Sequence, residues 1–248
     1  MTHLSAAAWV QHLLFLFLLV VAPAWDLHYT RRLKRDPSSA RKVGVYKTQC
    51  AWQWIAAAVA VFAVGFRPIF TITLAPGGDA WLDLAWVHWL LVAVIALFAL
   101  GVVLPYAVVL WKKVKARPRK YASAEALKPM MWFLPATANE RRWFALASVT
   151  AGICEELLFR GFLLRYLHIV PWRLPLTAAL VVAAVIFALQ HLYQGAVGSA
   201  VTGVIGLLLS LLFLLTGNLL APMVLHAVTD LRMLVILPAP GKASAAAG

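Results

Sequence analysis

The chain has 248 residues, of which 63% are hydrophobic and 12% are charged, and its formal net charge is +13. A soluble domain is usually about half apolar and a quarter charged, so this composition excludes an ordinary soluble globular protein. The apolar excess lies in blocks long enough to cross a bilayer, for which about 20 residues suffice. The composition therefore predicts an integral membrane protein.

The basic residues gather in two stretches that border apolar blocks. Seven lie between Arg31 and Lys47, and nine lie between Lys112 and Arg142. Clusters at helix ends are typical of the cytoplasmic loops of membrane proteins. We therefore expect no nucleic-acid partner, and we expect these stretches to contact the surface of a lipid bilayer.

Seven apolar blocks predict an all-α protein, a polytopic membrane bundle of about seven transmembrane helices. In chain order they cover roughly residues 5–25, 51–75, 84–111, 143–167, 174–192, 197–216 and 218–237. The first block ends in Ala22-Pro23-Ala24, which is similar to a signal-peptidase site. Because no Lys or Arg precedes this block and a basic run follows it, we predict a retained helix.

Counting Lys and Arg in the connections predicts the orientation. With the N-terminus outside, the predicted cytoplasmic segments carry 17 of the 22 basic residues. Such an asymmetry sets membrane topology. We therefore predict an external N-terminus and a cytoplasmic C-terminus, and the high Ala, Leu and Val content indicates a bacterial inner membrane.

The fourth helix is predicted to begin at a capping box. Thr137-Ala138-Asn139-Glu140 has the Thr-x-x-Glu form of this motif. A helix from Thr137 to Leu167 would be ~46 Å long, whereas the hydrocarbon core of a bilayer is ~30 Å thick. This helix must therefore begin in the interface, tilt or break.

Three blocks after residue 150 contain polar residues that are costly in hydrocarbon. These residues are Glu155, Glu156 and Arg160 in the fourth block, Gln190 and His191 in the fifth, and His226, Thr229 and Asp230 in the seventh. Ionisable groups within membrane helices normally face the bundle interior or a water-filled cavity, and they mark function by default. The sequence therefore predicts a site inside the bilayer.

The two adjacent glutamates have different predicted roles. Glu156 and Arg160 are four residues apart, so they share a helix face and can form an ion pair. We interpret this pair as mainly architectural. Glu155 is rotated ~100° from Glu156, so it is free to face the other polar helices, where a carboxylate in a dry site suits a general base or acid.

The histidines complete the predicted site. His226 and Asp230 are also four residues apart and present their side chains to a common point, while His191 adds an imidazole from another helix. Together with Glu155, these groups could activate water and stabilise an oxyanion. Each histidine alone is also compatible with a core group bonded to backbone. Phe187 is expected to pack and to shape the cavity.

These segments resemble the CPBP intramembrane protease family, which includes the type II CAAX prenyl endopeptidase and the bacterial Abi proteins. The family motifs EExxxR, FxxxH and HxxxN/D match Glu155–Arg160, Phe187–His191 and His226–Asp230, in this order. The resemblance implies that Glu155 is the general base, assisted by His191, and that His226 and residue 230 stabilise the oxyanion or orient the water.

Two points remain open within this resemblance. The prenyl endopeptidases typically have Asn at the last motif position, where this chain has Asp230, which could be protonated or could orient His226. The family has also been described as metalloproteases, and Glu155, His191 and His226 could form a zinc site. A metal-free glutamate mechanism also fits and is favoured here, so no cofactor is expected.

The sequence therefore divides into an N-terminal membrane region (1–136), a catalytic core (137–238) and a disordered tail (239–248). The predicted function is hydrolysis of a peptide bond in a membrane-embedded or lipid-modified protein or peptide. The alternatives are a proton-coupled transporter and a non-catalytic membrane immunity or scaffold protein of the same fold. The transporter is disfavoured because the polar residues concentrate in one half and no internal repeat is seen.

Overall fold

The computed structural model describes residues 5–72, 82, 84–114, 130–169 and 171–237. Within these ranges the chain is almost entirely helical, and the only strand-like pairing is an isolated bridge between Thr71 and Asn218. The predicted all-α fold is therefore confirmed. The predicted tail 239–248 lies outside the described residues.

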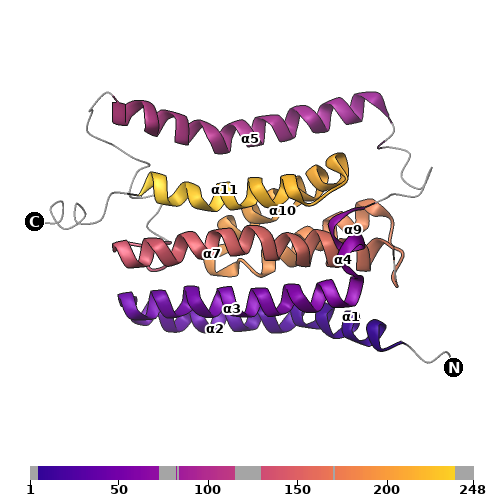
Figure 1. The fold of residues 1–248 in the computed structure, drawn as a ribbon, viewed down its shortest axis with the longest axis horizontal. Coiled ribbons are helices and arrows are strands. Elements are labelled where there is room, and N and C mark those ends of the chain that lie inside the picture. Colours follow the sequence, from indigo (N-terminus) through magenta and orange to yellow (C-terminus); the bar gives the residue numbers. More distant parts are fainter. Residues whose placement is uncertain (1–4, 73–81, 83, 115–129, 170, 238–248) are drawn as a thin grey trace, which may run out of the picture.

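The helices, in chain order, are α1 (Ala6–Leu16), η1 (Phe17–Val21), α2 (Ala22–Arg35), α3 (Ser39–Val64), α4 (Phe66–Phe70), α5 (Ala85–Val114), α7 (Ala138–Glu156), η3 (Leu157–Leu164), α8 (Arg165–His168), α9 (Leu176–Leu189), η4 (Leu192–Gln194), α10 (Gly195–Thr216) and α11 (Leu220–Ile236). The long helices run roughly side by side (Figure 1). Helix α7 packs against α3 on one side and α11 on the other, whereas α5 lies at the edge of the bundle and contacts α11.

Three described segments are long and apolar enough to cross a membrane. They are Ala6–Arg35, Ala85–Val108 and Leu192–Thr216. Helix α5 also exposes large apolar side chains such as Trp89 and Leu97, which are 68% and 69% exposed. A face of this kind is unfavourable in water and suited to lipid. These features indicate a membrane protein, and the number of seven spans stays a prediction.

The first helix is longer than the apolar block that predicted it. It continues through α2 to Arg35, so the basic run after residue 30 forms its last turns instead of a loop. Basic side chains are favourable there because they face the negative end of the helix dipole. The next block also differs, since α3 begins at Ser39 and ends at Val64, followed by Gly65, where φ is +98°.

A proline inside the first helix is accommodated by a π-helical turn. Pro23 has no N–H to donate, and the Ala22 N–H bonds to the carbonyl of Phe17, five residues back. The carbonyl of Leu18 instead accepts a hydrogen bond of 3.0 Å from the side-chain amide of Gln190. Side chains commonly satisfy backbone groups freed by proline in membrane helices. This bond ties the first helix to the turn that carries His191.

Candidate active site

The helix that carries both glutamates begins where the capping box predicts. The Thr137 side chain accepts a hydrogen bond of 3.2 Å from the Glu140 N–H, and α7 starts at Ala138. The Glu140 carboxylate accepts from the Ala136 N–H at 2.8 Å and lies 3.8 Å from the Lys42 ammonium. This fixed start places Glu155 and Glu156 at the end of α7, between α3 and α11.

Solvent screens the charge interactions of the Glu140 carboxylate only weakly, because Glu140 is only 2% exposed. Burial raises the pKa of Glu140, but the hydrogen bond from Ala136, other hydrogen bonds and the positive charge of Lys42 outweigh it. The net result is a pKa below the ordinary value. The carboxylate therefore stabilises the start of α7 in its ionised form.

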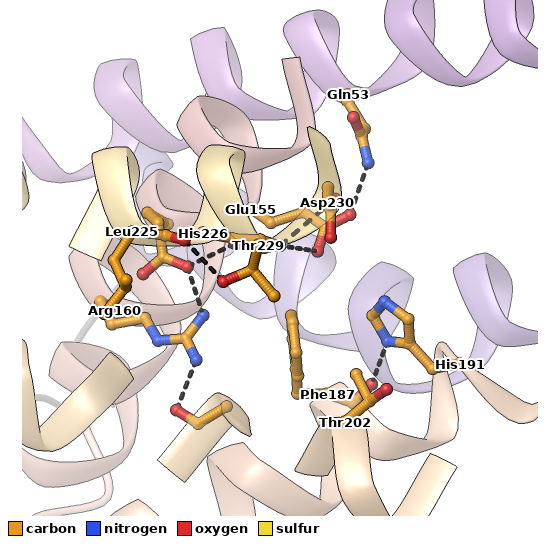
Figure 2. Close-up of polar contacts among 12 residues, drawn as sticks. Gln53, Glu155, Arg160, Phe187, His191, Thr202, Leu225, His226, Thr229 and Asp230 are labelled. Carbon is orange, nitrogen blue, oxygen red and sulfur yellow. Dashed lines mark hydrogen bonds and ion pairs between the residues drawn. The ribbon is translucent and has the colours of Figure 1, made fainter. Parts of the chain in front are cut away.

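Glu155 has one bound and one free carboxylate oxygen. Its Oε1 accepts a hydrogen bond of 2.7 Å from Nε2 of Gln53 on α3. Its Oε2 is buried and has no hydrogen-bond partner among the described residues, and it lies 3.8 Å from Nε2 of His226. Figure 2 shows Gln53 and His226 approaching this carboxylate from different helices. The hydrogen-bonding capacity of Oε2 is thus not used by any described residue.

Glu156 is fully buried and supports two partners. Its Oε1 accepts from Arg160 Nη1 at 3.0 Å, which is the predicted ion pair, and from His226 Nδ1 at 2.7 Å. Arg160 also donates to the Ser210 hydroxyl at 3.2 Å and to the carbonyl of Gly206. Glu156 therefore connects the guanidinium of Arg160 to the imidazole of His226. The motif spacing does not reveal the contact between Glu156 and His226.

Arg160 lies in a π-helical stretch, η3, that follows Glu156 without a break. The long helix predicted from the sequence thus changes its hydrogen-bonding pattern instead of ending. Single π-turns in membrane and soluble helices are frequent at functional sites. The guanidinium carbon of Arg160 lies 4.9 Å from the centre of the Phe187 ring, so Phe187 packs as predicted and covers the charge.

His226 is oriented by its contact with Glu156. Because a carboxylate accepts and Nδ1 must therefore donate, Nε2 is the ring atom left for the site. This atom lies 3.8 Å from Oε2 of Glu155 and 3.8 Å from Oδ2 of Asp230. The Asp230 side chain is 38% exposed, in contrast to the buried His226. The i,i+4 pair on α11 thus brings both side chains together, and His226 lies near Glu155.

His191 lies in a turn and not within its predicted helix. Helix α9 ends at Leu189, and His191 follows with φ −110° and ψ 17°. The helix stops because the next residues form a 3-10 turn held partly by the Ser199 hydroxyl, which donates to the His191 carbonyl at 2.7 Å. His191 Nδ1 donates to the Phe187 carbonyl at 2.8 Å, which leaves Nε2 free.

The predicted catalytic residues line one cavity of about 330 Å³. Its lining includes Glu155, His191, His226 and Asp230, together with Phe187. Glu156 and Arg160 are not part of this lining, which agrees with a supporting position behind the wall. A site that is concave, largely apolar and equipped with a few convergent polar groups is the usual form of a substrate site.

Several lining residues were not among the predicted site residues. Gln53, Gln49 and Asp26 come from α2 and α3, in the region before residue 136. The available signal was the presence of amide and acidic side chains in or beside apolar blocks. Spacing could not reveal their contact with α7, because Gln53 and Glu155 are 102 positions apart.

The zinc alternative would require Glu155, His191 and His226 as ligands. Across the described ranges, no three His, Cys, Asp or Glu side chains are arranged to hold a metal ion. His226 donates one ring N–H to Glu156 and His191 donates one to the Phe187 carbonyl, and bonds of this kind are also made by histidines that bind a metal through the other nitrogen. Zinc binding by Glu155, His191 and His226 therefore stays an alternative, and the metal-free mechanism stays a prediction.

The fold and site together define a helical membrane protein with a buried carboxylate–imidazole centre. Residues 137–232 match the family model of type II CAAX prenyl endopeptidase Rce1-like proteins. This segment is thus similar to that family, as its motifs predict, and the match supports a membrane protease. No significant match was found among curated proteins or among solved structures.

Proposed function

We propose that this protein is an intramembrane endopeptidase that hydrolyses a peptide bond with water activated by Glu155. The observation that carries the proposal is the buried, unpaired Oε2 of Glu155, a residue that lines a cavity of about 330 Å³, and this atom lies 3.8 Å from His226 Nε2. A general base must be within hydrogen-bond reach of the proton it takes. A water molecule in this cavity would meet that requirement.

In the proposed reaction, Glu155 takes a proton from water while the water oxygen attacks the carbonyl carbon of the peptide. The carbonyl double bond opens to a tetrahedral oxyanion. When the oxyanion collapses, the C–N bond breaks and the proton held by Glu155 passes to the leaving nitrogen. The second water proton stays on the new carboxyl group, so the products are a carboxylic acid and an amine, or the carboxylate and ammonium after proton transfer between them, and Glu155 is regenerated.

His226 is the group that we assign to the oxyanion. Its Nδ1 is bonded to Glu156, so a proton on Nε2 would be donated into the cavity. Such a fixed donor stabilises charge as it develops. Asp230 lies 3.8 Å from the same Nε2, and we assign it the role of orienting this imidazole. Its carboxylate is a poor oxyanion donor unless it is protonated.

His191 is assigned an assisting role in proton transfer. Its Nδ1 is held by the Phe187 carbonyl at 2.8 Å, so the ring cannot turn freely and Nε2 is the exchangeable position. In Figure 2 the ring lies across from Glu155 and Asp230. This position suits a group that exchanges protons with water or with the leaving amine.

The proposed substrate is a membrane-embedded or lipid-modified protein or peptide. Apolar side chains such as Trp52, Leu134 and Phe144 line the cavity, and the exposed apolar side chains of α5 are suited to lipid. We further propose a bacterial inner membrane with the N-terminus outside and the C-terminus in the cytoplasm, because the basic residues concentrate in the segments that would then be cytoplasmic.

The test is hydrolysis of candidate membrane peptides by the purified protein in detergent or lipid, with the products identified by mass spectrometry. We expect new carboxyl and amino termini at one bond, and the same rate with a strong chelator. Loss of activity in chelator and its return with zinc would contradict the metal-free mechanism. Proton-coupled uptake of a solute without any cleavage would instead favour the transporter.

A further inference from the structure

Glu155 is held by a residue outside the Rce1-like segment. Gln53 on α3 is 1% exposed, and its Nε2 donates to Oε1 of Glu155 at 2.7 Å. We propose that Gln53 is a positioning residue of the active site, which fixes the Glu155 carboxylate so that Oε2 is the oxygen that accepts the proton. This inference rests on the proposed role of Glu155 as general base.

The chemistry of the two groups decides how the amide is turned. An ionised carboxylate only accepts hydrogen bonds, so the amide nitrogen of Gln53 must face Glu155. The terminal torsion of a glutamate side chain is otherwise broad. With Oε1 held by Gln53, rotation of the carboxylate is restricted and Oε2 stays near His226 Nε2, at 3.8 Å. The base is then preorganised for the water.

Packing does not explain a glutamine at this position. The following turns of α3 contribute Ala56, Ala57 and Ala60 to the main hydrophobic core, so this face of the helix is apolar. The Oε1 atom of Gln53 is buried and has no hydrogen-bond partner in the described part of the chain. An amide buried with one group unpaired costs free energy that an apolar side chain would not cost. The bond to Glu155 is therefore the reason we give for this residue.

Gln53 also connects the two halves of the chain at the reacting group. Figure 2 shows it reaching from its own helix to the carboxylate of Glu155. Helix α3 packs along α7, so the amide is carried by a rigid element and not by a loop. Outer partners that orient a reacting group commonly change activity 10- to 100-fold when removed, by analogy with metal sites.

The test compares Gln53→Met with Gln11→Met in the cleavage assay. Methionine has a similar length but no amide. Gln11 is the matched control because it also bonds to α3, through the Ala63 carbonyl at 2.9 Å, but it does not line the cavity. We expect kcat of Gln53→Met to fall roughly 10- to 100-fold with KM unchanged, and Gln11→Met to keep the wild-type kcat. Thermal unfolding of both variants shows whether they fold.

Gln53→Asn is the second variant, since it keeps the amide but is one methylene too short for the same bond. The same loss of kcat is expected. The inference is overturned if folded Gln53→Met has the wild-type kcat or changes in KM alone. It is also overturned if neither Gln53→Met nor Gln53→Asn folds. Glu155→Gln is the reference: if it is inactive while Gln53→Met is normal, the positioning role fails and the proposed function stands.

Discussion

At the scale of single residues, the two adjacent glutamates differ in what their carboxylates contact. Glu156 accepts hydrogen bonds from Arg160 and His226 through Oε1 and does not line the cavity, whereas Glu155 accepts one from Gln53 and does line it. Each carboxylate leaves its Oε2 without a hydrogen-bond partner among the described residues. The first arrangement stabilises structure, and the second is open to chemistry. Adjacent positions on α7 can differ so strongly because successive side chains point about 100° apart.

Removal of Arg160 is predicted to destabilise the fold. Arg160→Met leaves the buried Glu156 carboxylate without its cation, which costs about 3–5 kcal/mol. The control is Arg41→Met, because Arg41 and Asp36 form an ion pair at the same 3.0 Å distance but are half exposed. That variant should lose less than about 1 kcal/mol. The free energies of unfolding in detergent test both values. Equal losses of stability in the two variants would contradict the structural role of the Glu156–Arg160 ion pair.

The buried Glu140 predicts a dependence of stability on pH. Its folded-state pKa lies below the ordinary value of 4.5, so its stabilisation is complete above that value and is lost as the pH falls through the folded pKa. Glu140→Gln should therefore be less stable than the wild type at neutral pH, and the difference should shrink in acid. Thermal unfolding across this range measures it, and a difference that grows on acidification would be the opposite result.

At the scale of elements, the site depends on how closely α7 approaches α11. A Cβ built on Gly152 would lie 2.7 Å from both the Cβ and the backbone nitrogen of Ala227. Gly152 precedes Glu155 by three residues, and Ala227 follows His226. The absence of a side chain at Gly152 therefore sets the spacing between the base and its imidazole partner.

A side chain at Gly152 is predicted to separate these helices. Gly152→Val should destabilise the protein by about 1–3 kcal/mol through overpacking and should lower the cleavage rate, because it displaces Glu155 from His226. Gly101→Ala on α5 is the control, since nothing lies within 4 Å of its Cβ position; alanine there should be neutral or stabilising. A wild-type rate in Gly152→Val would show that this contact does not position the site.

Local spacing was sufficient to predict part of this site. The pairs Glu156–Arg160 and His226–Asp230 follow from four-residue separation on a helix, and the start of α7 follows from Thr137. The bond between Glu156 and His226 could not be predicted, because it depends on how two helices cross. The π-helical stretch η3 and the turn at His191 depend likewise on tertiary contacts that no local pattern encodes.

At the scale of the whole molecule, the helical fold follows from apolar block length, whereas the assignment of spans does not. Helix α7 carries charged residues and α9 is short, so length and composition identify only Ala6–Arg35, Ala85–Val108 and Leu192–Thr216 as candidate spans in the described ranges. The remaining helices hold the polar site and pack around it. A membrane protein that encloses a polar centre must reduce the apolarity of the helices that line it.

The proposed orientation makes a prediction about the termini. A reporter that is active only in the cytoplasm, fused after residue 248, should be active, and the same reporter fused before residue 1 should be inactive. The physical reason is the retention of basic segments on the cytoplasmic side. The opposite pattern would contradict the proposed orientation.

The most direct test of the account is the cleavage rate of Glu155→Gln relative to the wild type, in folded protein with a cleaved substrate. Glutamine keeps the size of the side chain but cannot accept the proton of water. Loss of a general base is expected to lower kcat by about 100- to 10,000-fold, with an unchanged unfolding temperature as evidence of folding. A folded Glu155→Gln variant that cleaves at the wild-type rate would contradict the assignment of Glu155 as the base.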